Sequence, residues 1–110
     1  MLFTISRKLD QLPSYPTLRK LAEQSKVSVL GNEHVGSFSS SGVEGTYEFR
    51  EQDIRGTFAG HGVKGEFFFE LGNASITINE KPFWLPEALL KQKITDGLNK
   101  LCEKMVGLRD

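Results

Sequence analysis

The chain has 110 residues, of which 38% are hydrophobic and 25% charged, a composition that excludes a fibrous repeat and a disordered segment. Its formal net charge is zero, but residues 1–26 carry +3, residues 27–80 carry −5 and residues 81–110 carry +2. Because an acidic central region is a poor partner for phosphate backbones, we expect no nucleic-acid binding.

The N-terminal quarter predicts a strand followed by a short helix. Residues 2–5 are apolar and β-prone and are expected to form the first strand. Ser14 is a suitable N-cap, and Pro16 is tolerated in a first helical turn. Leu18 and Leu21 lie on one face of this helix, and because the apolar stripe is narrow, we expect the helix to lie on a sheet.

The middle of the chain repeats one pattern three times: a β-branched residue, a charged residue, glycine, a polar residue and an aromatic residue. The copies lie at residues 43–49, 54–58 and 63–69. The alternation has period two, which is typical of a strand with one buried face. The glycine falls on the buried face each time, so the sheet is expected to bend there or another group to approach the backbone closely.

Shorter segments complete an antiparallel meander. Residues 27–30, 33–39 and 74–79 also read as strands. The separators 51–53 and 60–62 have the length and residue types of hairpin turns. Short connections of this kind favour antiparallel over parallel pairing.

The C-terminal segment predicts a long amphipathic helix. Pro86 suits the first helical position, and Glu87 suits the positive end of the helix dipole. The apolar stripe repeats at steps of three and four residues: Leu90, Ile94, Leu98, Leu101, Met105 and Leu108. Gly97 interrupts good helix formers, and we hypothesise that it allows close packing against the strand glycines.

These elements predict a single α+β domain over residues 1–110. We expect a curved antiparallel meander with a short N-terminal helix and a long C-terminal helix on its concave face. The expected order is one strand, a helix, four to six strands and the long helix. The long helix is the only predicted element large enough to cover the buried face of the sheet.

No motif for catalysis, a metal or a cofactor is found in the sequence. His34 and His61 have no second ligand at metal spacing, and we expect no metal site and no cofactor. Cys102 lies on the apolar helix face and is expected to pack in the core. A non-enzymatic protein is therefore the main expectation; an enzyme using His61 would need a second polar group converging on that side chain.

Four apolar residues are candidate binding residues. Phe68 must face away from Phe67 and Phe69, among acidic neighbours, and could contact a partner. Phe83, Trp84 and Leu85 precede the long helix, where we expect them at the opening between sheet and helix. They could form a staple that fixes the start of the helix, or they could contact a lipid surface, a hydrophobic polymer or a partner chain.

From the glycine patterns to the last helix, the chain resembles the bacterial polyhydroxyalkanoic acid system proteins. The resemblance rests on residues 42–46 or the equivalent 62–66, on residues 74–78 and on residues 89–94. It implies association with polyester granules and no established catalytic residues. The order of elements is also similar to the helix-grip or TATA-binding-protein-like architecture, an analogy at the level of fold alone.

Two functions are expected from these observations. The first is a non-enzymatic binding protein at the surface of a polyhydroxyalkanoate granule or another hydrophobic body. The alternative is a carrier of a small apolar ligand, such as a lipid or fatty acid, held between the sheet and the C-terminal helix. Homodimerisation is a further expectation, since an open meander leaves sheet edges that need cover.

The cellular setting is expected to be the cytoplasm. No apolar run approaches the ~20 residues of a membrane-spanning helix. Arg7 and Lys8 follow the first apolar run, whereas a signal peptide places basic residues before it. A single cysteine cannot form an internal disulfide, which fits a reducing compartment.

Overall fold

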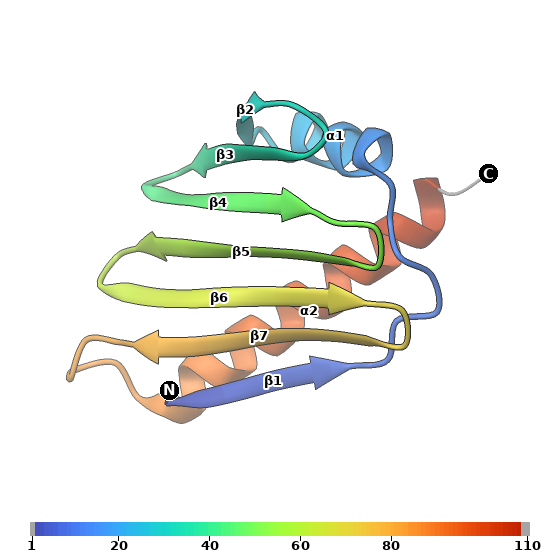
Figure 1. Ribbon diagram of the computed structural model, residues 1–110. Helices are drawn as coiled ribbons and strands as arrows, with labels where there is room; N and C mark the ends of the chain where they lie inside the picture. Colours follow the sequence, from blue (N-terminus) through green and yellow to red (C-terminus); the bar gives the residue numbers. More distant parts are fainter. Residues whose placement is uncertain (1, 109–110) are drawn as a thin grey trace.

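The computed structural model describes the backbone of residues 2–108 and the side chains of residues 2–105. The described residues form an α+β fold in the predicted order (Figure 1). The elements are β1 (Phe3–Arg7), α1 (Tyr15–Gln24), β2 (Ser28–Gly31), β3 (Val35–Ser40), β4 (Val43–Phe49), β5 (Asp53–Gly60), β6 (Val63–Glu70), β7 (Asn73–Glu80) and α2 (Glu87–Leu108).

The strands form one seven-stranded sheet with the order β1-β7-β6-β5-β4-β3-β2. Every neighbouring pair is antiparallel, which confirms the predicted meander from β2 to β7. β1 is added beside β7, where Phe3 pairs with Ile78. The turns after β3 and β5 place Ser41 and His61 at positive φ, each followed by a positive-φ glycine, the pattern of two-residue hairpin turns.

Both helices lie on the same face of the sheet, behind it in the view of Figure 1. The Ser14 side chain accepts a hydrogen bond from the Thr17 backbone N–H at 3.3 Å, which confirms the predicted cap of α1. In α2 the Leu90 N–H donates to the Pro86 carbonyl at 3.2 Å. Pro86 therefore precedes the first helical residue, one position earlier than predicted.

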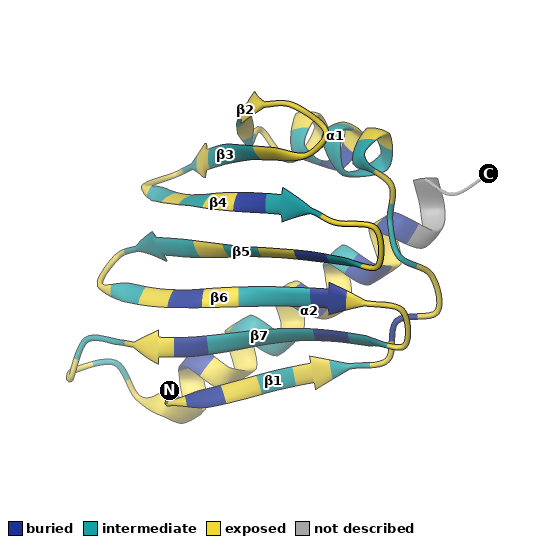
Figure 2. Ribbon diagram, viewed as in Figure 1, coloured by how far each residue is buried: buried dark blue, intermediate teal, exposed yellow. Residues whose placement is uncertain are grey.

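The apolar core is uneven across the sheet. One cluster joins α2 to the centre of the sheet through Ile54, Leu98 and Cys102, and a second joins the start of α2 to Phe3 and Ile78. Along β2 and β3 no residue is fully buried, and in α1 only Leu21 is. Figure 2 shows the same contrast, with dark, buried segments along β5, β6, β7 and α2. The half of the domain under α1 is therefore less tightly filled than the half under α2.

The expectation that the long helix alone covers the sheet was wrong. α2 runs obliquely from β1 towards α1, and α1 covers the other end of the sheet, over β2 to β4 (Figure 1). Leu21 of α1 belongs to the same core cluster as Leu98 and Met105 of α2. A seven-stranded sheet is too wide for a single helix, because packed helices lie only about 10 Å apart and strands about 4.8 Å apart.

The strand glycines lie on the inner face, as predicted, and aromatic rings fill the space beside them. A Cβ built on Gly56 would lie 2.5 Å from Cζ of Phe67, and one built on Gly65 would lie 2.6 Å from Cζ of Phe58. Each ring belongs to the residue directly across the neighbouring strand. The same arrangement joins two further glycine–aromatic pairs: Gly45 with Phe38 and Gly36 with Tyr47. The glycines therefore accept the rings of their cross-strand partners.

The hypothesis that Gly97 packs closely against these glycines was wrong. Gly97 is exposed, and a Cβ built on it would meet nothing within 4 Å among the described residues. The helix turns this position towards solvent, since its neighbour Leu98 is the residue that faces the core.

Candidate functional site

An apolar cavity of about 340 Å³ lies between α1 and the sheet. Its size falls within the range of small-molecule sites, near the lower end. Phe38, Phe58 and Phe67 on the inner face remain partly exposed, so the cavity is reached from solvent. It occupies the less tightly filled half of the domain.

The floor of the cavity is a set of aromatic rings. They come from four consecutive strands, β3 to β6: Phe38, Tyr47, Phe49, Phe58, Phe67 and Phe69. Several of these rings lie over the glycines of neighbouring strands, as described above, so they lie along the sheet instead of standing up from it. Each inner-face glycine therefore leaves space above the sheet in two ways. It has no side chain of its own, and it lets the neighbouring aromatic ring lie flat against the sheet. The repeated sequence pattern supplies all of these rings except Phe38.

Helix α1 supplies the opposite wall. Residues at steps of three and four face the cavity: Tyr15, Leu18, Arg19, Ala22 and Ser25. From α2 only Leu101 contributes among the described lining residues. The cavity therefore lies mainly under α1, whereas the sequence placed a ligand between the sheet and the C-terminal helix.

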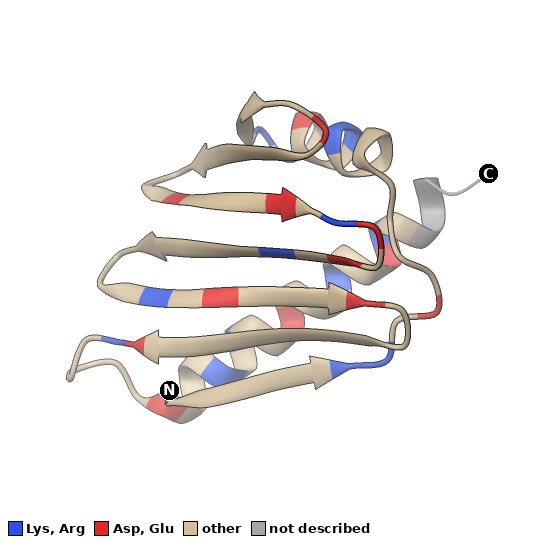
Figure 3. Cartoon of the chain, in the orientation of Figure 1, with Lys and Arg blue, Asp and Glu red and all other residues tan. Residues whose placement is uncertain are grey.

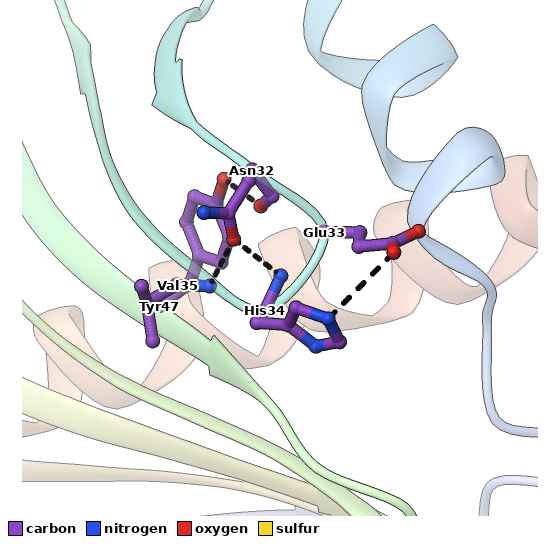
Figure 4. A network of polar contacts seen from close by, with 5 residues as sticks. All are labelled: Asn32, Glu33, His34, Val35 and Tyr47. Atoms are coloured by element: carbon purple, nitrogen blue, oxygen red, sulfur yellow. Dashed lines mark hydrogen bonds and ion pairs between the residues drawn. The ribbon is translucent and has the colours of Figure 1, made fainter.

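Tyr47 lies at the end of the floor nearest the β2–β3 turn (Figure 4). Its hydroxyl donates a hydrogen bond to the Asn32 carbonyl at 2.8 Å. The Asn32 side chain accepts from the backbone N–H groups of His34 and Val35 at 2.8 and 3.0 Å, which closes the turn. Burial raises the pKa of Tyr47, the neighbouring Tyr15 raises it further, and the positive charge of Arg19 partly opposes both. The hydroxyl therefore stays protonated and keeps its bond to the turn.

The predicted residues Phe83 and Trp84 lie outside this cavity. They are 96% and 68% exposed, in the loop between β7 and α2. Leu85 instead packs against the second core cluster, as a staple would. The Lys81 ammonium donates to the Leu85 carbonyl at 2.8 Å, and the Leu85 N–H donates to the Pro82 carbonyl at 3.1 Å. This braced turn holds Phe83 and Trp84 towards solvent.

Phe68 lies on the outer face of the sheet, as its alternation predicted. It pairs across the strands with Arg55, whose guanidinium lies 5.1 Å from the ring centroid. Such a cation–π contact at an exposed site contributes about 0.5–1 kcal/mol. Phe68 therefore contacts Arg55 and does not form a common site with Phe83, Trp84 and Leu85.

The two histidines and the cysteine do not line the cavity. His61 is exposed, and its Nε2 lies 2.9 Å from the Ser41 carbonyl in the next turn. His34 is exposed beside Glu33, with 3.6 Å between Nε2 and Oε1 (Figure 4). Cys102 is buried, and that burial raises the pKa of its thiol. Across the described residues, no group of three His, Cys, Asp or Glu side chains could hold a metal ion.

Charged residues are dispersed over the fold. Lys and Arg alternate with Asp and Glu along α2 and are scattered over the strands (Figure 3). Within residues 2–108, no helix is long and apolar enough to cross a membrane.

Comparison with known proteins adds no relative: no protein-family model, no curated protein and no solved structure matches this chain. The candidate function is thus carried by the geometry of the chain itself.

The part that α1 plays in the cavity was not predicted from the sequence. Tyr15, Arg19 and Ala22 follow the helical period, so their common face was readable from the sequence. Arg19 interrupts the apolar face of this helix, and a charge at such a position is a signal for a partly buried polar site. The cavity itself depends on the distance between α1 and the sheet, which no local pattern encodes.

Proposed function

We propose that this protein binds a small, predominantly apolar ligand in the cavity between α1 and the sheet. The observation that carries the proposal is the aromatic floor, a continuous apolar surface that is only partly covered by the helices. A ligand that covers these rings removes apolar area from water, which contributes about 25 cal/mol per Å². The helix-grip resemblance is consistent with a carrier of this kind.

Filling the cavity should weaken ligand binding. Ala22 is a half-buried cavity residue of α1, and the indole of Ala22→Trp would occupy the space above the floor. We expect the small neutral probe 1-naphthylamine to bind the natural protein saturably, with enhanced fluorescence and displacement by 1-octanol. Ala22→Trp should weaken this binding at least about tenfold, the loss of one buried apolar group.

Ala88→Trp is the matched control. Ala88 is an exposed residue of α2 outside the cavity, so the same substitution there should leave probe binding unchanged. Thermal unfolding of both variants reports whether the fold is kept. Absence of saturable binding in the natural protein, or equal binding by Ala22→Trp, would contradict the proposed cavity function.

We propose docking on a hydrophobic surface as a second candidate function. It is favoured by Phe83 and Trp84, two adjacent aromatic side chains held out of the core by the braced turn. Aromatic residues of this kind prefer the boundary between water and an apolar phase. The surface of a polyester granule, which the family resemblance implies, is such a boundary.

Removing both side chains should release the protein from such a surface. We expect Phe83→Ser with Trp84→Ser to reduce co-flotation with polyhydroxyalkanoate granules or neutral phospholipid vesicles at least about tenfold, since each buried aromatic contributes about 1.5–3 kcal/mol. Leu71→Ser is the control, because Leu71 is 71% exposed in the β6–β7 turn, at the opposite end of the sheet (Figure 1). Unchanged flotation of the double variant would show that this loop does not mediate docking.

A further inference from the structure

Arg19 is the one charged residue among the described residues that line the cavity. It lies on α1 one turn after Tyr15 and is half-buried. A guanidinium in partly apolar surroundings is costly unless an anion or several acceptors compensate it. The partners of Arg19 therefore indicate what the cavity is suited to hold.

The Arg19 guanidinium has unused donors. One N–H donates to the Val29 carbonyl on β2, at a long distance of 3.4 Å. A guanidinium carries five N–H donors. Among the described residues, no carboxylate lies within 4 Å of it, whereas Arg55 is paired with Asp53 at 3.2 Å.

The charge of Arg19 acts on the wall of the cavity. It is close enough to Tyr47 to lower the pKa of that hydroxyl against the effect of burial. Tyr15 lies beside them, with its ring centroid 6.2 Å from that of Tyr47. The lining of the cavity is almost entirely apolar, so the Arg19 guanidinium lies at its rim, between α1 and β2 and next to the apolar floor.

We propose that the ligand is an amphiphilic carboxylate whose head group binds Arg19 and whose chain lies on the aromatic floor. This inference rests on the proposed cavity function and names its ligand class. A carboxylate matches the planar fork of a guanidinium and accepts two parallel hydrogen bonds from it. At about 30 Å³ for each small group, 340 Å³ holds on the order of ten non-hydrogen atoms, the size of octanoate.

Calorimetric titration with octanoate and 1-octanol distinguishes the contribution of the head group to affinity from that of the alkyl chain. The natural protein should bind octanoate about tenfold more tightly than 1-octanol, the low end for a hydrogen bond to a charged group. Arg19→Gln should remove this preference by weakening octanoate about tenfold and leaving 1-octanol unchanged. Lys20→Gln removes the same charge from the exposed neighbouring position and should change neither affinity.

The outcomes distinguish this inference from the proposed function. If both ligands bind the natural protein equally, or if Lys20→Gln weakens octanoate as much as Arg19→Gln does, the head-group site is overturned and the apolar cavity stands. If neither ligand binds, both proposals fail. Retained binding of 1-octanol by Arg19→Gln shows that the variant is folded, so a selective loss of octanoate assigns the site to Arg19.

Discussion

Replacing Gly56 with alanine is expected to lower the free energy of unfolding by about 3 kcal/mol, the upper end for forced overpacking. The new Cβ would collide with the Thr46 carbonyl oxygen and would lie 2.5 Å from Cζ of Phe67. One of these groups is backbone in a central strand pair and cannot move without disturbing the ladder. Urea unfolding followed by circular dichroism measures the change.

Gly97→Ala is the matched control in the same chain. Gly97 is exposed within α2, and a Cβ built there would meet no described atom within 4 Å. Alanine should raise stability by about 0.5–1 kcal/mol, because glycine loses more backbone entropy in a helix. Equal effects at Gly56 and Gly97 would show that the ring contact has no role. A double-mutant cycle with Phe67→Leu measures how much of the Gly56 effect comes from the ring.

Truncation of Ile54 or Ile78 to alanine should each cost about 3–4 kcal/mol, as for other fully buried isoleucines. Ile54 is 1% exposed and Ile78 is 0% exposed. The two sites differ in function, because Ile54 lines the cavity and Ile78 belongs to the second core cluster. Chemical unfolding measures the loss of stability for both.

The two truncations should differ in their preference for the chain length of the ligand. Ile54→Ala enlarges the cavity, so decanoate should gain about tenfold over octanoate, the contribution of two further methylene groups. Ile78→Ala leaves the cavity wall intact and should keep the chain-length preference of the natural protein. A gain for decanoate in Ile78→Ala, or none in Ile54→Ala, would contradict the assignment of the cavity floor.

Most of the fold could be predicted because its signals are local. Strict alternation assigned the inner faces of β4, β5 and β6, and Gly62 with its neighbour His61 marked the turn between two of them. Helix α2 was readable from its apolar stripe. The arrangement of the helices was not predictable, since the distance of α1 from the sheet and the outward position of Gly97 depend on tertiary packing.

The candidate site was predictable only in part. The sequence indicated that another group could approach the backbone at the inner-face glycines, but it could not tell a ring beside Gly45 from a helix beside it. The sequence also could not tell whether Trp84 is exposed, because a helix staple and a surface contact would use the same residue types. Arg19 was visible on the apolar face of α1, yet a long basic side chain on such a face often reaches solvent from a buried stem.

The position of β1 at the edge beside β7 has a consequence for the order of assembly during synthesis. Phe3 precedes the meander in the chain, whereas its partner Ile78 lies in the last strand of the meander. The hairpins from β2 to β7 join neighbours along the chain, whereas closing β1 onto β7 requires a long loop and is entropically slow. β1 therefore stays unpaired until β7 has been made, and the sheet is complete only when these two strands meet.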